Sequence, residues 1–345
     1  MDRRTFLIAA GGVALFARGA PGRERARSRL GIAVYALGNR IRARPAEGLD
    51  DPLRFLERCR DLGAGGVQIA LGVRDDASAA RLRERAEADG MFVEGIVKLP
   101  TGRGDLERFE AEMRTAARAG ARVARTVLTP GRRYEKYRDA EEFRAALRRG
   151  RESLEAAEPL AAKHGVRIAV ENHNDQRVEE RLEILRALSS EHVGACVDPA
   201  NAFSLLEDPV RVAEAYAPFA LSVHLKDLAV REHPDGFLEA DVALGDGIVD
   251  LPKVVRVLRE AKPEVRFQLE TIAKEPHLVP CLTDAYWDLL GSAPARDLAA
   301  TLRAVRARAA AQLPPFEELS VEERIEREEA MVRRSLAYAG ERLGL

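Results

Sequence analysis

The chain has 345 residues, of which 46% are hydrophobic and 32% are charged, with a formal net charge of −1. This composition is typical of a globular protein with one large core or two ordinary ones, and the balanced charge argues against binding to nucleic acid or to anionic membranes. The three cysteines, Cys59, Cys196 and Cys281, are too few and too scattered for a disulfide framework, although the sequence leaves open whether two of them pair.

The first 28 residues contain a pair of arginines followed by an apolar run. Arg3 and Arg4 precede a Gly- and Ala-rich segment that extends to Phe16. This order resembles a twin-arginine export signal, and the run is shorter than the roughly 20 apolar residues that a spanning helix needs. We therefore expect no stable membrane insertion. We expect export to the periplasm, or a cytoplasmic location if residues 1–28 are an ordinary basic N-terminus.

From Leu30 onwards, strand-like runs alternate with segments of helical spacing. The expected strands cover residues 30–37, 66–71, 91–98, 122–128, 167–172, 193–198, 220–226 and 265–271. The expected helices cover residues 51–62, 76–89, 105–119, 139–163, 179–188, 208–216 and 250–261. These strand–helix units follow one another without a break in composition, which predicts an α/β fold of the (β/α)8 TIM-barrel type. A doubly wound sheet is disfavoured because no GxGxxG turn follows the first strand.

Three segments extend this simple pattern. Long loops are expected at 229–250 and 273–294, after the seventh and eighth strands, where they would border the catalytic face of a barrel. Near the C-terminus, Ser320 and Glu323 form a capping-box pattern at the start of a helical repeat. We therefore expect residues 29–312 to form the barrel. Residues 313–345 should form a helix packed on the barrel or on a partner subunit, so a homo-oligomer stays open.

Four polar residues stand where four of the expected strands end: Glu171, Asp198, His224 and Glu270. Alternate residues of a strand share a face, and counting back by two from each of them gives small or polar residues, Ala169, Cys196, Ser222 and Gln268. The intervening positions are apolar and suit packing against helices. The four polar residues are therefore expected to converge at the mouth of the barrel.

Three carboxylates and one imidazole make a plausible site for a divalent metal ion. This set favours Mn²⁺, Mg²⁺ or Co²⁺, with Mn²⁺ as the first expectation and Zn²⁺ as an alternative. Such an ion would acidify a C–H group next to the bound oxygens of a sugar. Glu171 and Glu270 come from non-adjacent strands and could move protons on either side of the substrate. Asp198 and His224 are expected to be ligands only.

The motifs ENH at 171–173, VDPAN at 197–201, HLKD at 224–227 and QLE at 268–270 occur in the order of a known family. Over residues 30–275 the chain resembles the xylose-isomerase-like barrel superfamily, in particular its tagatose/psicose 3-epimerase-like and inosose isomerase-like branch. The resemblance implies that the four residues bind one divalent metal and that both glutamates exchange protons with the substrate through an enediolate-like intermediate. Many members carry a histidine three residues after the aspartate, where this chain has Asn201.

Four polar residues near strand ends are candidate substrate contacts: His173, Lys226, Gln68 and Lys98. The resemblance adds Asn201, at the position of the family histidine, and Arg231, as the counterpart of a family arginine in the loop after the seventh strand. The leading hypothesis is an isomerase or epimerase of a free sugar or sugar derivative, with a small-molecule carbohydrate as its partner. The alternative keeps the site but makes the enzyme a lyase or hydratase of 3-keto-glycosides. A carbohydrate-binding barrel without activity is a more remote alternative. A related apurinic endonuclease is disfavoured because the chain has only six histidines and no basic excess.

Overall fold

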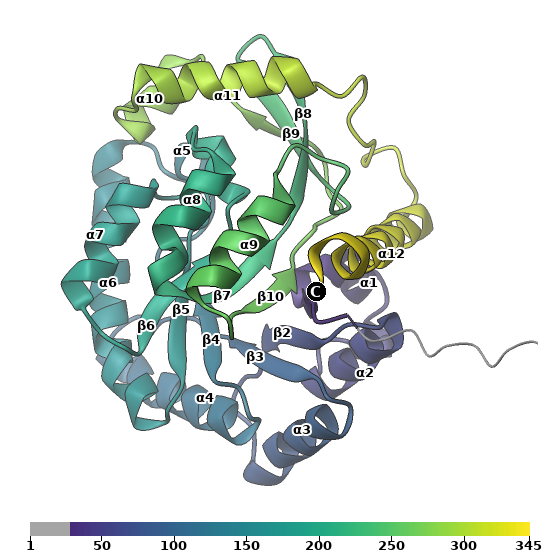
Figure 1. Ribbon diagram of the computed structural model, residues 1–345. Helices are drawn as coiled ribbons and strands as arrows, with labels where there is room; N and C mark the ends of the chain where they lie inside the picture. The colour runs from purple at the N-terminus through teal and green to yellow at the C-terminus, as the bar shows by residue number, and fades with distance from the viewer. Residues whose placement is uncertain (1–27) are drawn as a thin grey trace, which may run out of the picture.

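A computed structural model of the protein describes residues 28–345 and shows a closed barrel of eight parallel strands (Figure 1). The expected fold class is confirmed. Around the barrel the strands follow the order β1, β10, β7, β6, β5, β4, β3 and β2. Their bounds are β1 Gly31–Ala33, β2 Gly66–Ala70, β3 Phe92–Ile96, β4 Val123–Thr126, β5 Arg167–Glu171, β6 Val193–Val197, β7 Ala220–Leu225 and β10 Arg266–Leu269. The expected export signal lies outside the described residues, apart from Ser28.

Helices cover the outer face of the barrel. The helices that follow the strands are α2 Pro52–Leu62, α3 Asp76–Ala88, α4 Leu106–Arg118, α6 Ala140–Lys163, α7 Val178–Leu188, α8 Pro209–Tyr216 and α9 Leu251–Ala261. Short helices fill several connections: η1 Val34–Leu37, α1 Gly38–Ala43, η2 Pro45–Glu47, η3 Arg103–Asp105, α5 Arg133–Lys136, η4 Asn201–Leu205 and η5 Ala217–Phe219. Outward-facing residues such as Ile168, Val197 and Leu225 join the apolar faces of these helices in one core, as the strand phase predicts.

Local sequence fixes where the helices begin and end. The Asp51 carboxylate accepts hydrogen bonds from the backbone N–H groups of Leu53 and Arg54, and Pro52 occupies the first helical position of α2. Gly63 ends this helix with a φ of 88°, a left-handed conformation that favours glycine. The first expected strand, 30–37, is too long, because the chain leaves the sheet after Ala33 and turns into η1 and α1.

The two expected long loops instead contribute to a second, three-stranded sheet. Strands β8 Asp227–His233 and β9 Gly236–Val242 form an antiparallel hairpin, and β11 His277–Val279 pairs with β9. Helices α10 Asp284–Leu290 and α11 Ala295–Arg308 follow, and α11 lies against β8. The loop prediction is therefore wrong for much of 229–250 and 273–294. The acidic residues of GFLEADV, in β9, weaken the apolar alternation that indicates a strand.

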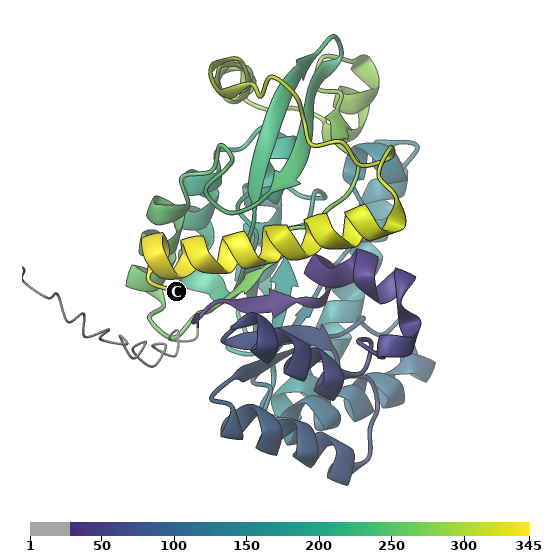
Figure 2. The ribbon, with the colours of Figure 1, turned by 90° about the vertical axis from the view of Figure 1, so that its right-hand side faces the viewer.

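The C-terminal helix α12, Val321–Tyr338, packs against α1, so that the two ends of the described chain lie side by side (Figures 1 and 2). The expected capping box of Ser320 and Glu323 forms at its start. The η6 turn, Ala339–Leu343, follows it. The buried Glu328 carboxylate accepts hydrogen bonds from the backbone N–H groups of Asn39, at 2.6 Å, and Arg40, at 3.0 Å. This contact from a distant segment holds the start of α1, the helix that follows β1 and η1.

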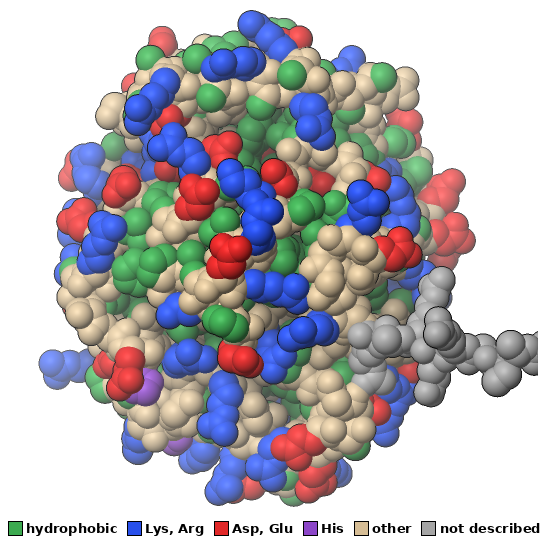
Figure 3. All heavy atoms as spheres, viewed as in Figure 1, with side chains coloured by type: hydrophobic (Ala, Val, Ile, Leu, Met, Phe, Trp, Pro, Cys, Tyr) green, Lys and Arg blue, Asp and Glu red, His purple; other side chains and the backbone are tan. Residues whose placement is uncertain are grey.

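The surface charges and the state of the cysteines match what the composition indicates, namely a balanced charge and no disulfide framework. On the face shown in Figure 3, Lys and Arg side chains are interspersed with Asp and Glu side chains. Within residues 28–345, no helix has the length and apolar character needed to cross a membrane. Cys59, Cys196 and Cys281 are all buried and unpaired.

Candidate metal centre

The four expected ligand residues converge at one end of the barrel. Glu171 is the last residue of β5, Asp198 follows β6, His224 lies near the end of β7, and Glu270 follows β10. These strands are consecutive neighbours in the barrel, so their carboxyl ends meet. All four side chains are buried, and one potential ligand atom from each lies within 4.8 Å of the others. The sequence prediction that they gather in one place is confirmed.

The imidazole of His224 is oriented by a residue from β2. Its Nε2 lies 2.7 Å from Oε1 of Gln68, while Nδ1 lies 3.1 Å from Glu270 Oε2 and 3.7 Å from Glu171 Oε1. The Gln68 amide nitrogen donates to Glu94 at 3.0 Å, which fixes the direction of the amide. An amide oxygen can only accept, so Nε2 donates its proton to Gln68, and Nδ1 is the ring nitrogen that faces the carboxylates and is available to a metal ion.

Two buried atoms in the cluster lack a hydrogen-bond partner among the described residues: His224 Nδ1 and Asp198 Oδ2. Lys226 Nζ lies 3.2 Å from Asp198 Oδ2, but this ion-pair contact lacks hydrogen-bond geometry. Buried polar atoms are nearly always paired, and a divalent cation would satisfy both. Oxygen donors with one imidazole nitrogen are ligands that such cations accept. The residues present therefore fit a divalent metal ion.

The surroundings of the cluster shift the pKa values of its carboxyl groups in different directions. Burial alone would raise the pKa of Glu171, but the Arg125 guanidinium and the His224 imidazole hold it well below its usual range. Burial likewise opposes the charge of Glu270, whose pKa is lowered to about 2 chiefly by His224. For Asp198, burial outweighs the attraction of Lys226 and raises the pKa to about 7. The cluster is thus a site where buried negative charge needs cations nearby.

A polar layer lies beneath the cluster, inside the barrel. The buried carboxylate of Glu94, from β3, accepts hydrogen bonds from Ser222 Oγ at 2.7 Å, Gln68 Nε2 at 3.0 Å and Gln268 Nε2 at 3.1 Å. Burial is the main reason that the pKa of Glu94 is raised. The sequence analysis missed Glu94 and Arg125. A charged residue in the middle of the short runs FVEGI and VART was the signal that could have found them.

Three of the expected substrate contacts line a cavity of about 200 Å³ beside the cluster, together with Glu270: His173, Asn201 and Lys226. Asn201 Nδ2 donates to Glu171 Oε1 at 3.2 Å, and its Oδ1 accepts from Lys226 Nζ at 2.6 Å. Asn201 therefore connects Glu171, a proposed metal ligand, to the ammonium group of Lys226 at the wall of the cavity.

The other three expected contacts lie elsewhere. Gln68 is fully buried below His224, where it orients the imidazole instead of facing the cavity. Arg231 is exposed on β8, because strand alternation turns Val230 inward and Arg231 outward. Lys98 is exposed after β3. The geometry thus brings none of these three side chains to the cavity.

The cavity is also lined by titratable residues that the sequence analysis did not select. They come from the loop before α5 (Arg132), from β9 (Glu239 and Asp241), from the loop after β10 (Lys274) and from β11 (His277). Each of these residues lies in or beside a segment that was expected to be a loop. Strand phase therefore could not predict which way their side chains point.

The sequence matches a family model described as a xylose isomerase-like TIM barrel over residues 56–304. The chain belongs to this family. A curated relative is 3-oxo-isoapionate decarboxylase from Pectobacterium atrosepticum, which is 27% identical over 241 residues, covering 67% of this chain and 80% of the relative.

Solved structures agree with the xylose isomerase-like fold. An L-ribulose 3-epimerase matches with a TM-score of 0.56 and 14% identity, covering 92% of this chain and 95% of that one. A D-psicose 3-epimerase with D-tagatose from Clostridium cellulolyticum H10 matches with a TM-score of 0.54 and 12% identity, covering 80% and 96%. The probable 3-DHS dehydratase AsbF from Bacillus anthracis matches with a TM-score of 0.53 and 12% identity, covering 76% and 96%. At these identities the likeness shows the fold alone.

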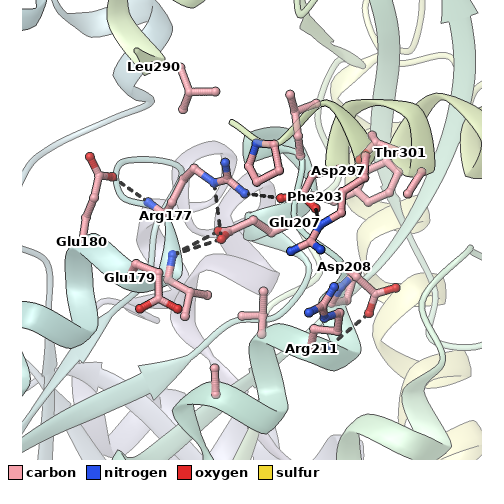
Figure 4. Close-up of a pocket in the computed structure, with 18 of the residues that line it drawn as sticks. Arg177, Glu179, Glu180, Phe203, Glu207, Asp208, Arg211, Leu290, Asp297 and Thr301 are labelled. Atoms are coloured by element: carbon pink, nitrogen blue, oxygen red, sulfur yellow. Dashed lines mark hydrogen bonds and ion pairs between the residues drawn. The ribbon is translucent and has the colours of Figure 1, made fainter. Parts of the chain in front are cut away.

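This xylose isomerase-like barrel also has a larger cavity, of about 740 Å³, between α7, α8 and α11 (Figure 4). Three of its charged groups, Arg177, Glu207 and Asp297, form ion pairs with one another. Arg177 lies 2.7 Å from Asp297 and 3.4 Å from Glu207, whose carboxylate also accepts from the backbone N–H of Val178. None of the four proposed ligand residues lines this larger cavity, whereas Glu270 lines the smaller one, so we place the chemistry at the smaller cavity.

Proposed function

We propose that the protein is a divalent-metal-dependent isomerase or epimerase of a free sugar or sugar derivative. The observation that carries this proposal is the convergence of four buried ligand residues, with His224 Nδ1 and Asp198 Oδ2 unpartnered, beside a small polar cavity. Membership of the xylose isomerase-like family and the epimerase structures of the same fold support it.

Glu171, Asp198, His224 and Glu270 would hold one divalent ion, with Mn²⁺ as the first expectation. When bound, the ion supplies Lewis-acid polarisation of a substrate oxygen, which makes the adjacent C–H group more acidic. Glu270 lines the cavity and is placed to take that proton. Both oxygens of Glu171 have protein partners, Oε2 in contact with Arg125 and Oε1 accepting from Asn201 Nδ2 at 3.2 Å, so a second proton transfer through Oε1 would have to displace the hydrogen bond from Asn201.

Lys226 and Asn201 would orient the substrate. The ammonium group of Lys226 lies 2.6 Å from Asn201 Oδ1 and 3.9 Å from Glu270 Oε2, at the wall of the cavity. Burial would lower the pKa of Lys226, but Asp198 and Asp241 raise it, so the group stays charged. It can therefore donate to a carbonyl or hydroxyl oxygen and stabilise negative charge that develops there.

A second candidate is cleavage next to the carbonyl, either loss of carbon dioxide from a 3-oxo sugar acid or elimination from a 3-keto-glycoside. The contact of Arg125 with Glu171 favours it, because this contact leaves Glu270 as the carboxylate best placed for proton transfer. Decarboxylation needs one group that returns a proton, whereas epimerisation through two carboxylates needs two. The curated relative is named as a decarboxylase of a 3-oxo sugar acid.

The two candidates differ in their products. The metal-loaded protein is incubated in D₂O with unphosphorylated ketoses, 3-keto-glycosides and 3-oxo sugar acids, and followed by proton and carbon NMR. An isomerase or epimerase keeps every carbon and yields a new isomer with deuterium at the reacting carbon. A cleaving enzyme releases carbon dioxide or a free aglycone. The absence of both exchange and product throughout the panel would contradict the two candidates together.

A further inference from the structure

The proposed chemistry uses Glu270, Lys226 and Asn201 at the small cavity and leaves other lining residues without a role. Four of them, Arg132, Glu239, Asp241 and Lys274, are charged side chains from outside the barrel strands and are called the second wall below. Its carboxylates stand on β9, and its cations come from the loops before α5 and after β10. The barrel strands do not supply these residues, so the wall is an addition to the eight-stranded core.

Two buried atoms of this wall lack partners within the described part of the chain: Glu239 Oε2, an acceptor, and Arg132 Nε, a donor. Glu239 is only 7% exposed, so bulk water does not solvate its carboxylate freely. A buried polar atom without a partner is costly, and such atoms in a folded protein need an explanation. A hydroxyl group both donates and accepts, and is therefore the chemical group that matches an unpaired acceptor beside an unpaired donor.

The charges of the wall favour an uncharged occupant. Arg132 and Lys274 are two cations, Glu239 and Asp241 are two carboxylates, and Glu135 also lines the cavity, so cations are not in excess. Asp241 Oδ2 also accepts from the backbone N–H of Ile272 at 2.9 Å, which fixes its position. Phosphate and carboxylate groups are normally bound where cations are in excess. Here an anionic group would also meet the unpaired oxygen of Glu239.

The size of the cavity suits one sugar unit. Its volume of about 200 Å³ is below the roughly 300–1,000 Å³ typical of pockets for drug-sized ligands. Glu270 and Lys226 line the same space. One small molecule can therefore contact the reacting groups and the second wall at once.

We propose that Arg132, Glu239, Asp241 and Lys274 form a subsite for the hydroxyl-bearing, uncharged end of the substrate, away from its reacting carbon. The subsite selects free sugars over the same sugars carrying a terminal phosphate. This inference rests on the proposed function and adds a substrate class to it. The deuterium experiment above does not depend on this wall and tests the function separately.

Binding of sugar alcohols tests the subsite, because hexitols lack the carbonyl and are not turned over. A panel of hexitols is titrated calorimetrically into the Mn²⁺-loaded full-length protein. The tightest binder is then compared with its terminal deoxy and terminal phosphate forms. We expect the wild-type protein to bind the hexitol at least about tenfold more tightly than the deoxy form, since the latter leaves Glu239 unpaired. We expect it to bind the phosphate more weakly as well.

Two substitutions separate hydrogen bonding from charge. Glu239→Ala should remove both preferences, whereas Glu239→Gln keeps an acceptor and should lose only the discrimination against phosphate. Glu232→Ala is the matched control, because Glu232 is exposed on the same hairpin and pairs with Arg306. Three results would each overturn the subsite. The Glu239→Ala variant could keep both preferences of the wild-type protein. The wild-type protein could bind the phosphate more tightly than the hexitol, or it could bind no hexitol at all.

Discussion

The amide oxygen of Gln68 lies 2.7 Å from Nε2 of His224, on the side of the imidazole opposite the proposed metal ligands. Gln68 is held in turn by Glu94, which also binds Ser222 and Gln268. The orientation of the one imidazole in the cluster therefore depends on β2 and β3, which supply none of the four proposed ligands.

Replacing Gln68 should weaken metal binding without removing a ligand. Gln68→Leu removes the acceptor that fixes the imidazole, and loss of such supporting contacts typically costs about 10–100-fold in metal affinity. Competition with a chelator measures the affinity, and Gln312→Leu, at an exposed position, is the matched control. Equal affinities in the two variants would show that Gln68 does not position His224.

Removing the metal should destabilise the fold. A metal that binds the folded chain alone stabilises it by about 2.7 kcal/mol at a free concentration of 100 times Kd. Thermal unfolding with Mn²⁺ and with a chelator measures this difference. Asp198→Asn should lose most of it, because a charged oxygen donor is removed, whereas Asp235→Asn, an exposed change on the hairpin, should keep it. Equal melting temperatures of the wild-type protein with Mn²⁺ and with the chelator would argue against the metal site.

Glu328 should stabilise the fold by joining α12, near the C-terminus, to α1, near the start of the described chain. Glu328→Ala leaves the N–H groups of Asn39 and Arg40 without their acceptor, which should cost about 1–3 kcal/mol for unpaired buried groups. Urea unfolding measures the change. The control, Glu326→Ala, changes an exposed residue of the same helix and should cost little. Equal losses in both variants would mean that the contact adds no specific stability.

His277 should make the fold sensitive to mild acid. Burial, with help from Arg132 and Lys274, lowers its pKa to about 3, and Glu135, 3.2 Å from Nδ1 but half exposed, offsets this only weakly. In the unfolded chain the pKa of this histidine is near 6.5, so below that pH the unfolded chain binds a proton at His277 that the folded chain does not bind. Stability is therefore lost as the pH falls, by up to about 2 kcal/mol between pH 7 and pH 5.

A variant that cannot titrate isolates this effect. His277→Gln should lose less stability than the wild-type protein over the same pH interval. Urea unfolding at several pH values measures both curves. Parallel curves for the two proteins would assign the acid sensitivity to other groups.

Strand phase predicted much of the barrel and the convergence of Glu171, Asp198, His224 and Glu270, because a period of two determines which side chains share the interior. The same reasoning failed where the chain leaves the barrel. The charged residues of β8 and β9 obscure their alternation, so Glu239 was overlooked. Arg231, which the family resemblance suggested as a substrate contact, is exposed on β8. The start of α1, which follows β1 and η1, is held by Glu328, 289 residues from Asn39, and local sequence does not reveal that contact.

The central claim is that one divalent metal at the four-residue cluster enables proton transfer by Glu270. The most direct test measures metal content and solvent-deuterium incorporation into a reacting carbohydrate on the same preparations. We predict one metal ion per wild-type chain, exchange that stops after chelation and returns with Mn²⁺, and no exchange in a metal-loaded Glu270→Gln variant. Exchange at the wild-type rate in the chelated protein or in metal-loaded Glu270→Gln would contradict the claim.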